Sequence, residues 1–350
     1  MTGGVRYAKP NAQIRAMLSR LLTAEQKRRL LNATDVADVA HQLAGTDYAK
    51  PLAPVLSGAI SLPAIEKALT SILVDSYARV IATLSGSSQD LVVEMLRRLE
   101  LNNVKTIIRA IVKATAAEEV ESMLIPLGRF SQLPLADLLQ VDNLADALDT
   151  LASTPYAQVI GNALDRFAQE HSLFPIEIAL DLDYYRRLWR KVEALGGQDK
   201  KIACRLMGIR YDVLNIEWLV RYRLLYNLSP EEIFNYTLPF GYHINDELVR
   251  RAALVPDFLT LVSSLPEPYR SLLSTITPAN EVAEHAESVL SGYLVTVAER
   301  SLVGYPFQIG VVIAYLWLRE AELRDLRAIF EGKASGLSAE EIRELMISRG

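Results

Sequence analysis

The sequence is poor in the features that mark several large classes of protein. Its 350 residues include one cysteine, Cys204, so no disulfide can form within the chain, and we expect a reducing compartment. We interpret this cysteine as a small buried hydrophobe. Lysine and arginine number 37 against 42 acidic residues, and the formal net charge is −5. That balance argues against a nucleic-acid partner, because phosphate binding relies on a basic surface.

Long hydrophobic runs are also missing. The longest uncharged stretch, Pro306 to Leu318, is shorter than the roughly 20 apolar residues that cross a bilayer, so it predicts a buried helix. The N-terminus shows no basic patch followed by an apolar segment, so no signal peptide is expected. These patterns indicate a soluble, cytoplasmic protein without direct membrane insertion.

The usual signatures of catalysis are absent as well. The sequence contains neither G-x-x-x-x-G-K-[ST] nor G-x-G-x-x-G, the two common phosphate-binding loops. Four histidines are scattered without the spacing of metal ligands; they are His41, His171, His243 and His285. We therefore predict no catalytic, cofactor-binding or metal-binding residues, and no cofactor.

Two groups of residues could still be read as binding sites. Asp181 and Asp183 resemble the acidic helices of all-α isoprenoid synthases, but a second acidic cluster and a D-D-x-x-D motif are missing, so we interpret them as helix-start acids. The run Trp218 to Tyr226 interleaves aromatics with arginines, as in some single-strand binders. In an acidic chain it favours a helix with a buried aromatic stripe and snorkelling arginines.

What the sequence does contain is helical signals. Ser61 before Leu62-Pro63 predicts a helix start. Ser229 with Glu232, and Ser338 with Glu341, have the spacing of capping boxes, in which each side chain satisfies a free backbone N–H group at the helix start. No convincing run of alternating strands occurs. The predicted fold class is all-α.

Three markers recur in constant order along the chain. Similar segments surround Tyr48, Tyr156 and Tyr269, which are 108 and 113 residues apart. A second pattern, an acid followed three residues later by Asn or Asp, occurs on helices that also carry an arginine. Its three copies are Glu100-x-x-Asn103 with Arg109, Asp212-x-x-Asn215 with Arg221, and Glu322-x-x-Asp325 with Arg327. The third marker is the capping-box pair and its weaker copy at Glu118-Glu119.

These spacings predict three similar helical modules of about 110 residues, at 1–125, 126–236 and 237–350. The modules could close about a pseudo-threefold axis or form an open row, and the sequence permits both. A polar residue that returns in each otherwise apolar helix is interpreted as tying that helix to its neighbour by hydrogen bonds; lining of a binding surface is the alternative.

The chain resembles a known family, the C subunits of archaeal and bacterial V/A-type ATPases, which are related to the d subunit of the vacuolar enzyme. The resemblance rests on segments that span nearly the whole chain in the family's order. They are YAKPNAQIRAMLSRLL from Tyr7, the Leu30 to Tyr48 segment, the Asn103 to Arg109 helix, ALDLDYYRRLW, the Asp212 to Arg221 helix and PFQIGVVIAYLWLREAELRDLRAIFEGKASGLSAEEIRE from Pro306. Gln13 and Asp325 depart from the family's usual Arg and Asn, and both departures concern local contacts.

The resemblance implies a non-catalytic rotor subunit shaped as a pseudo-threefold funnel. Its partners would be the D and F subunits of the central shaft and the membrane proteolipid ring, and it would lie peripheral to the cell membrane. The isolated chain is expected to be monomeric. Two other functions stay open: a helical-repeat adaptor outside any rotary ATPase, and a magnesium-dependent isoprenoid synthase.

Overall fold

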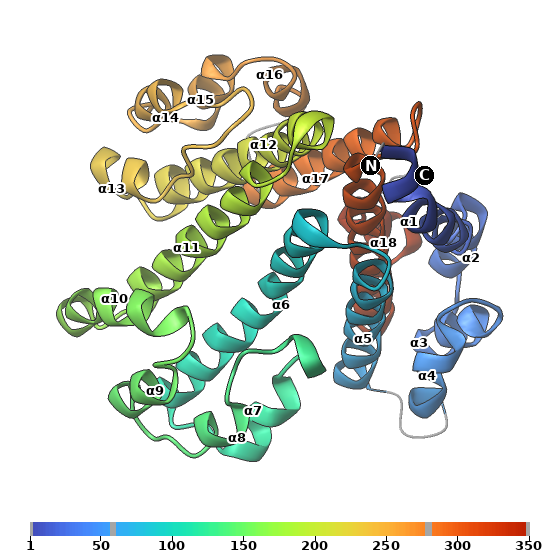
Figure 1. Cartoon of the computed structure of the whole chain (residues 1–350), viewed down its shortest axis with the longest axis horizontal. Coiled ribbons are helices and arrows are strands. Elements are labelled where there is room, and N and C mark those ends of the chain that lie inside the picture. The colour runs from blue at the N-terminus through green and yellow to red at the C-terminus, as the bar shows by residue number, and fades with distance from the viewer. Residues whose placement is uncertain (1–2, 57–60, 277–281, 348–350) are drawn as a thin grey trace. The chain divides into compact units, whose positions relative to one another are not determined.

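The computed structural model describes residues 3–56, 61–276 and 282–347, and all regular secondary structure in these ranges is helical. The predicted all-α fold is confirmed. Contacts divide the chain into two compact units. Unit 1 comprises Met1–Ser88 and Val192–Gly350, and unit 2 comprises Gln89–Lys191. Figure 1 labels the helices of both units.

Six helices recur in the same order three times. Each repeat has a long helix, three short helices, a helix that begins at or directly after a marker tyrosine, and a return helix. Repeat A consists of α6 (Gly86–Lys113), α7 (Ala117–Met123), α8 (Leu135–Leu138), α9 (Leu144–Thr150), α10 (Tyr156–Glu170) and α11 (Phe174–Glu193). Repeat B consists of α12 (Gly197–Val220), α13 (Pro230–Asn235), α14 (Asp246–Ala252), α15 (Phe258–Ser264), α16 (Tyr269–Leu273) and α17 (Val282–Ser301).

Repeat C is assembled from the two ends of the chain. Its long helix and first short helix are C-terminal, and its other four helices are N-terminal. They are α18 (Ile309–Ala334) and α19 (Ala339–Leu345), followed by α2 (Ala24–Leu31), α3 (Val36–Gln42), α4 (Ala49–Leu56) and α5 (Leu62–Ile81). Helix α1 (Gly3–Leu18) precedes the repeats, and short irregular turns are η1 (Leu43–Gly45), η2 (Gly128–Phe130) and the π-helical η3 (Arg221–Leu225).

The repeats map simply onto the compact units. Repeat A lies in unit 2 apart from the ends of α6 and α11, whereas α1 and repeats B and C lie in unit 1. Because the order of elements is cyclic, the chain can be divided at more than one point. The modules 1–125, 126–236 and 237–350, and their arrangement as a funnel, stay predictions.

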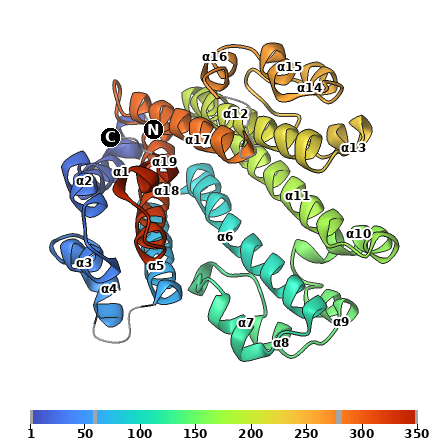
Figure 2. The same ribbon diagram turned by 180° about the vertical axis from the view of Figure 1, so that it is seen from behind.

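Helix α18 is the centre of unit 1. Helices α1, α5, α12 and α17 all pack against it, and the two views in Figures 1 and 2 show α5 and α17 beside it. Its first nine residues, Ile309 to Trp317, are buried. The uncharged run therefore forms a buried helix as predicted, except that Pro306 to Gln308 lie in the preceding loop. Burial of so many aliphatic and aromatic side chains is the main source of stability here.

The predicted helix starts are also present. Ser61 Oγ accepts a hydrogen bond from Ala64 N, which caps α5. Ser229 and Ser338 each form a complete capping box with the glutamate three residues later. These local contacts fix where the helices begin and thus set the phase of the side chains that follow.

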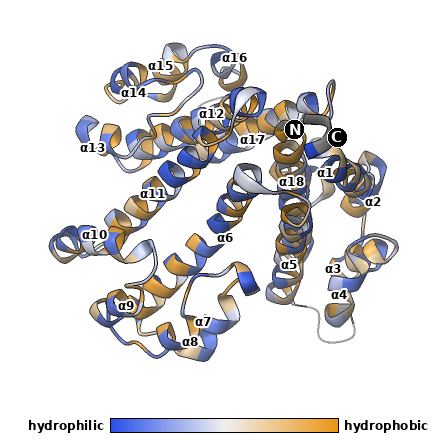
Figure 3. Cartoon of the chain, in the orientation of Figure 1, coloured by the Kyte–Doolittle hydropathy of each residue, from blue (hydrophilic) through white to orange (hydrophobic). Residues whose placement is uncertain are grey.

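Hydrophilic and hydrophobic residues are interspersed along the helices, as Figure 3 shows. Within the described ranges, no helix combines the length and the apolar character that crossing a membrane requires.

Candidate functional site

Each marker tyrosine donates a hydrogen bond to the buried acid of a long helix. Tyr156 Oη lies 2.9 Å from Glu100 Oε1, and Tyr269 Oη lies 2.8 Å from Asp212 Oδ2. The third pair joins opposite ends of the chain, with Tyr48 Oη 2.5 Å from Glu322 Oε2. All three rings and all three acids are buried. The tyrosine thus contacts the acid of the long helix that precedes it in the cyclic order.

The acids also bind backbone N–H groups of the segment that leads into the short helices. Asp212 accepts from His243 N at 2.8 Å and from Ile244 N at 2.9 Å, while Glu100 accepts from Gln132 N at 2.5 Å. Glu322 accepts from Leu22 N in the same way. A buried carboxylate is therefore satisfied in each repeat by a phenol and a loop N–H, which removes most of the cost of its burial.

Burial, and after it the nearby carboxylate, raises the pKa of all three tyrosines. Burial likewise raises the pKa of Asp212, although the N–H groups of Ile244 and His243 oppose that shift. The phenols consequently stay protonated and act as donors. These are structural hydrogen bonds between groups that lack open access to solvent.

The Asn or Asp three residues after each acid ties a second segment to the long helix. Asn103 exchanges two 2.8 Å hydrogen bonds with the backbone of Ile125, and Asn215 does the same with Leu238. In repeat C, Asp325 Oδ1 accepts from Ile347 N at 2.8 Å, and its Oδ2 lies 2.9 Å from Lys27 Nζ. The interpretation of these residues as hydrogen-bonded ties is confirmed. An aspartate can only accept here, so repeat C replaces the second amide bond by an ion pair.

The arginines of the long helices bind glutamates on the return helices. Arg109 forms a bidentate pair with Glu177 at 2.6 Å, and Arg221 Nη2 lies 2.5 Å from Glu287. In repeat C, Glu66 on the return helix lies 3.8 Å from Nε of Arg327, which is one helical turn closer to the acid than the arginines of the other two repeats. These pairs are more exposed than the tyrosine–acid pairs, so each contributes little stability on its own.

Repeat C carries one further buried charge. Arg319 Nη1 lies 2.7 Å from Glu322 Oε2 and 3.0 Å from Tyr48 Oη, and the arginine is 2% exposed. Sequence reasoning did not single out this residue. A buried ion pair at Arg319 could have been predicted, because Arg319 directly follows an uncharged run predicted to be buried, and a buried cation needs a partner.

The start of α12 holds a second polar junction that the sequence did not reveal. Asp199 Oδ2 accepts from Tyr7 Oη at 2.7 Å, and its Oδ1 accepts from Ile309 N at 3.0 Å. Tyr7 Oη also lies 2.8 Å from Ser88 Oγ, to which Arg6 donates at 2.6 Å. The first turns of α6, α12 and α18 are thus joined through α1 and one carboxylate.

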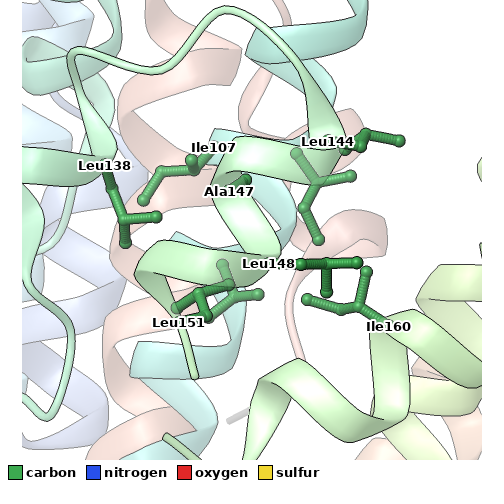
Figure 4. A pocket seen from close by; sticks show the side chains of 9 residues that line it. Ile107, Leu138, Leu144, Ala147, Leu148, Leu151 and Ile160 are labelled. Carbon is green, nitrogen blue, oxygen red and sulfur yellow. The ribbon is translucent and has the colours of Figure 1, made fainter. Parts of the chain in front are cut away.

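Unit 2 contains a small apolar cavity between α6, α8, α9 and α10 (Figure 4). Only aliphatic side chains line it; they are Val104, Ile107, Ile108, Leu138, Leu144, Ala147, Leu148, Leu151 and Ile160. A cavity without polar groups offers no means of orienting a polar ligand. We interpret it as a packing gap beneath the short helices.

Several known proteins are similar to this chain over almost its whole length. A family model described as ATP synthase (C/AC39) subunit matches residues 10–345. The chain belongs to that family. The C subunit of the A-type ATP synthase of Methanocaldococcus jannaschii is 27% identical over 348 residues, covering 98% of this chain and 86% of the relative. That of Methanothermobacter thermautotrophicus is 28% identical over 347 residues, covering 97% and 87%. That of Haloquadratum walsbyi is 26% identical over 346 residues, covering 95% and 96%.

In this member of the ATP synthase (C/AC39) family, the four histidines weighed as metal ligands belong to four different elements. His41 is in α3, His171 caps the end of α10, His285 is in α17, and His243 lies in the loop bound by Asp212. Among the described residues, no group of three or more His, Cys, Asp or Glu is arranged to hold a metal ion. Cys204 is half-buried rather than buried.

Besides that of Cys204, two interpretations from the sequence need correction. Asp181 and Asp183 are not helix-start acids, because α11 begins at Phe174. Asp181 instead pairs with Lys105 at 2.5 Å, and Asp183 pairs with Arg187 at 2.7 Å. The aromatic stripe is buried only in part.

In that stripe, Tyr222 is buried and stacks on Trp218, but Tyr226 is 56% exposed. The chain leaves the α-helical path at Arg221 and forms the π-helical η3, which turns the last aromatic outward. The guanidinium of Arg223 is not directed only toward solvent, because its Nε donates a hydrogen bond to Val255 O at 2.8 Å.

Proposed function

We propose that the chain is the non-catalytic central-stalk subunit of a V/A-type rotary ATPase. In this role it is a socket that couples the D and F subunits of the shaft to the membrane proteolipid ring, and it turns with them as a rotor. The observation that carries the proposal is the family match over residues 10–345. Relatives named as C subunits of A-type ATP synthases, which align over most of their length, support it.

The hydrogen-bonded construction of the repeats supports a mechanical role. A part that transmits torque has to resist shear between its helices. Here the long helices of all three repeats are tied to the start of the tyrosine helix by a tyrosine–acid pair, and to the segment after the first short helix by an Asn or Asp. Buried polar contacts of this kind have a single good geometry, so they hold helices in register where apolar packing alone allows sliding.

The proposal assigns catalysis to other subunits of the complex. Buried titratable groups such as Glu100, Asp212 and Glu322 are already occupied by phenol and backbone donors. A carboxylate bound in this way has no free oxygen aimed at a substrate. We further propose that the protein works at the cytoplasmic face of the membrane, as a peripheral component, and that it is monomeric on its own.

A binding titration of the purified chain against the D–F shaft complex of the same organism tests the proposal. We expect one-to-one association, and loss of binding when the foot of the shaft is truncated. Folded chain that fails to bind folded D–F complex contradicts the socket function. In that case a helical adaptor outside any rotary ATPase becomes the better hypothesis.

A further inference from the structure

One end of unit 1 gathers positive charge, against the acidic balance of the whole chain. We call this surface the basic pole. Its cations lie on α1, at the start of α12 and at the end of α17; they are Arg6, Lys9, Arg15, Lys200, Lys201, Arg205 and Arg300. The acids in the same region are Glu193, Glu299 and the largely buried Asp199.

Contacts between the helices place these cations at one end of the unit. Arg15 Nη2 donates to Leu302 O at 3.3 Å, which sets α1 against the loop before α18. Asp199 binds both Tyr7 and Ile309, which brings the first turns of α12 and α18 to α1. Helices α12 and α17 pack against each other, and both pack against α18. The positive ends of the α12 and α18 dipoles add to this field.

The loop at this pole carries exposed apolar side chains. The connection between α17 and α18 runs over residues 302–308, whereas the connections before α6 and α12 run only over 82–85 and 194–196. At its tip Val303 is 79% exposed and Tyr305 is 61% exposed. Tyr305 packs edge-on against Phe307 with ring centroids 5.6 Å apart, and Gln308 Nε2 donates to Tyr305 O at 3.1 Å. The tip is therefore held in shape while its apolar side chains face water.

An exposed apolar loop beside arginines of α1 and α17 is complementary to an anionic lipid surface. Each cation near such a surface contributes attraction, and tyrosine prefers the boundary between headgroups and acyl chains. Val303 and Tyr305 combine high exposure with neighbouring cations, which is the composition of interfacial anchors.

We propose that the basic pole binds anionic lipid headgroups, with Val303 and Tyr305 entering the interfacial layer. The contact is peripheral and adds a direct lipid interaction to the proposed function. It does not depend on shaft binding, and the two are tested separately.

Vesicle co-sedimentation with the full chain tests this proposal. The vesicles are phosphatidylcholine alone, or phosphatidylcholine with about 30% phosphatidylglycerol, each at low salt and at about 0.15 M salt. The first variant is Val303→Ser with Tyr305→Ser. The second is Lys200→Gln with Lys201→Gln, for which about fivefold weaker binding is expected per charge removed.

Matched controls lie away from the pole. Leu254→Ser with Leu259→Ser removes two leucines that are 67% and 61% exposed on or beside α14 and α15. Lys50→Gln with Lys67→Gln removes two exposed lysines on α4 and α5. In addition, Tyr305→Trp supplies a fluorescence probe, whose emission should shift to shorter wavelength only with anionic vesicles.

Binding that requires anionic lipid, falls in both pole variants and persists in both controls supports the proposal. Equal binding to both kinds of vesicle, or equal losses in pole and control variants, overturns it. Polyglutamate serves as an acidic protein surrogate. If the Val303→Ser, Tyr305→Ser variant binds anionic vesicles and polyglutamate as the parent chain does, the pole is a general electrostatic surface for acidic proteins and the lipid proposal fails.

Discussion

Tyr48 and Glu322 are 274 residues apart in the chain, yet the phenol of the first donates to the carboxylate of the second at 2.5 Å. The same bond within repeats A and B spans only 56 and 57 residues. The N-terminal short helices therefore complete a repeat that the C-terminal long helix begins. Lys27 with Asp325 and Arg327 with Glu66 join the same two segments.

Removing one phenol should destabilise the protein without changing its packing. Tyr156→Phe leaves Glu100 Oε1 buried without its donor, and a hydrogen bond to a charged group contributes roughly 1.5–3 kcal/mol. We expect a loss of about 2 kcal/mol in the free energy of unfolding, measured by urea titration. Tyr242→Phe, at a position 52% exposed, is the control and should change little. An equal effect of the two substitutions would contradict the role of the buried pair.

The charges around Glu322 should behave as a coupled set. Arg319→Met leaves Glu322 short of its cation, and breaking a buried pair costs about 3–5 kcal/mol. Glu322→Gln alone leaves the guanidinium of Arg319 without its anion. We expect the double variant to lose less stability than the two single losses combined, because no unpaired charge remains. Strict additivity in chemical denaturation would show that the pair is not coupled.

A glycine next to the acid of repeat B should not tolerate a methyl group. A Cβ at Gly241 would overlap Ile244 O and Asp212 Oδ1, the carboxylate that binds His243 N and Ile244 N. We expect Gly241→Ala to lower stability by about 2 kcal/mol or more, because the loop has to move off the acid. Gly45→Ala is the matched control, since a Cβ there meets no atom within 4 Å. Thermal unfolding of the two variants should therefore differ clearly.

The stability of unit 1 should depend on pH through Glu217. Burial, and then Glu287, raises the pKa of Glu217 to about 7, against the opposing effect of Arg210, Arg221 and Arg324. The equivalent positions on the other long helices are cations, Lys105 and Arg327. The folded protein thus holds a proton that the unfolded chain releases near pH 4.5, so stability falls as pH rises from about 4.5 to about 7.

Glu217→Gln removes this dependence. We expect the variant to be more stable than the parent chain at pH 8, on the order of 1 kcal/mol because the half-buried side chain is screened by solvent. At about pH 4, below the unfolded-state pKa, the two should unfold at similar urea concentrations. A stability difference that stays constant between acid and alkaline pH would rule out titration of Glu217 as its cause.

The sequence predicted the markers but not their partners. Tyr156 lies 59 residues before Asn215 and 56 residues after Glu100, so the spacing alone fits contacts in either direction. Only the three-dimensional arrangement of the helices shows that the partner of Tyr156 is the earlier residue, Glu100. The helices themselves were predictable, because capping boxes such as Ser229 with Glu232 act locally and need no tertiary information.

Other features depended on contacts that one sequence does not display. Asp199 joins three helix starts, yet in the sequence it is a single acid shortly after two glycines. For Asp181 the signal existed and was missed: Pro175 belongs to the first turn of α11, which places Asp181 well inside the helix. The apolar spacing of that helix also fits a later start, so the proline is the deciding residue.

Assembly of repeat C from both chain ends has a consequence for protein synthesis. Residues 89–191 hold both partners of the Tyr156–Glu100 pair, so this unit can fold while the rest is still being translated. Helices α1 to α5 leave the ribosome first, yet they wait for α18 and α19, which leave it last. Their apolar faces stay uncovered through nearly the whole of translation, and a chaperone that holds nascent chains has its clearest target there.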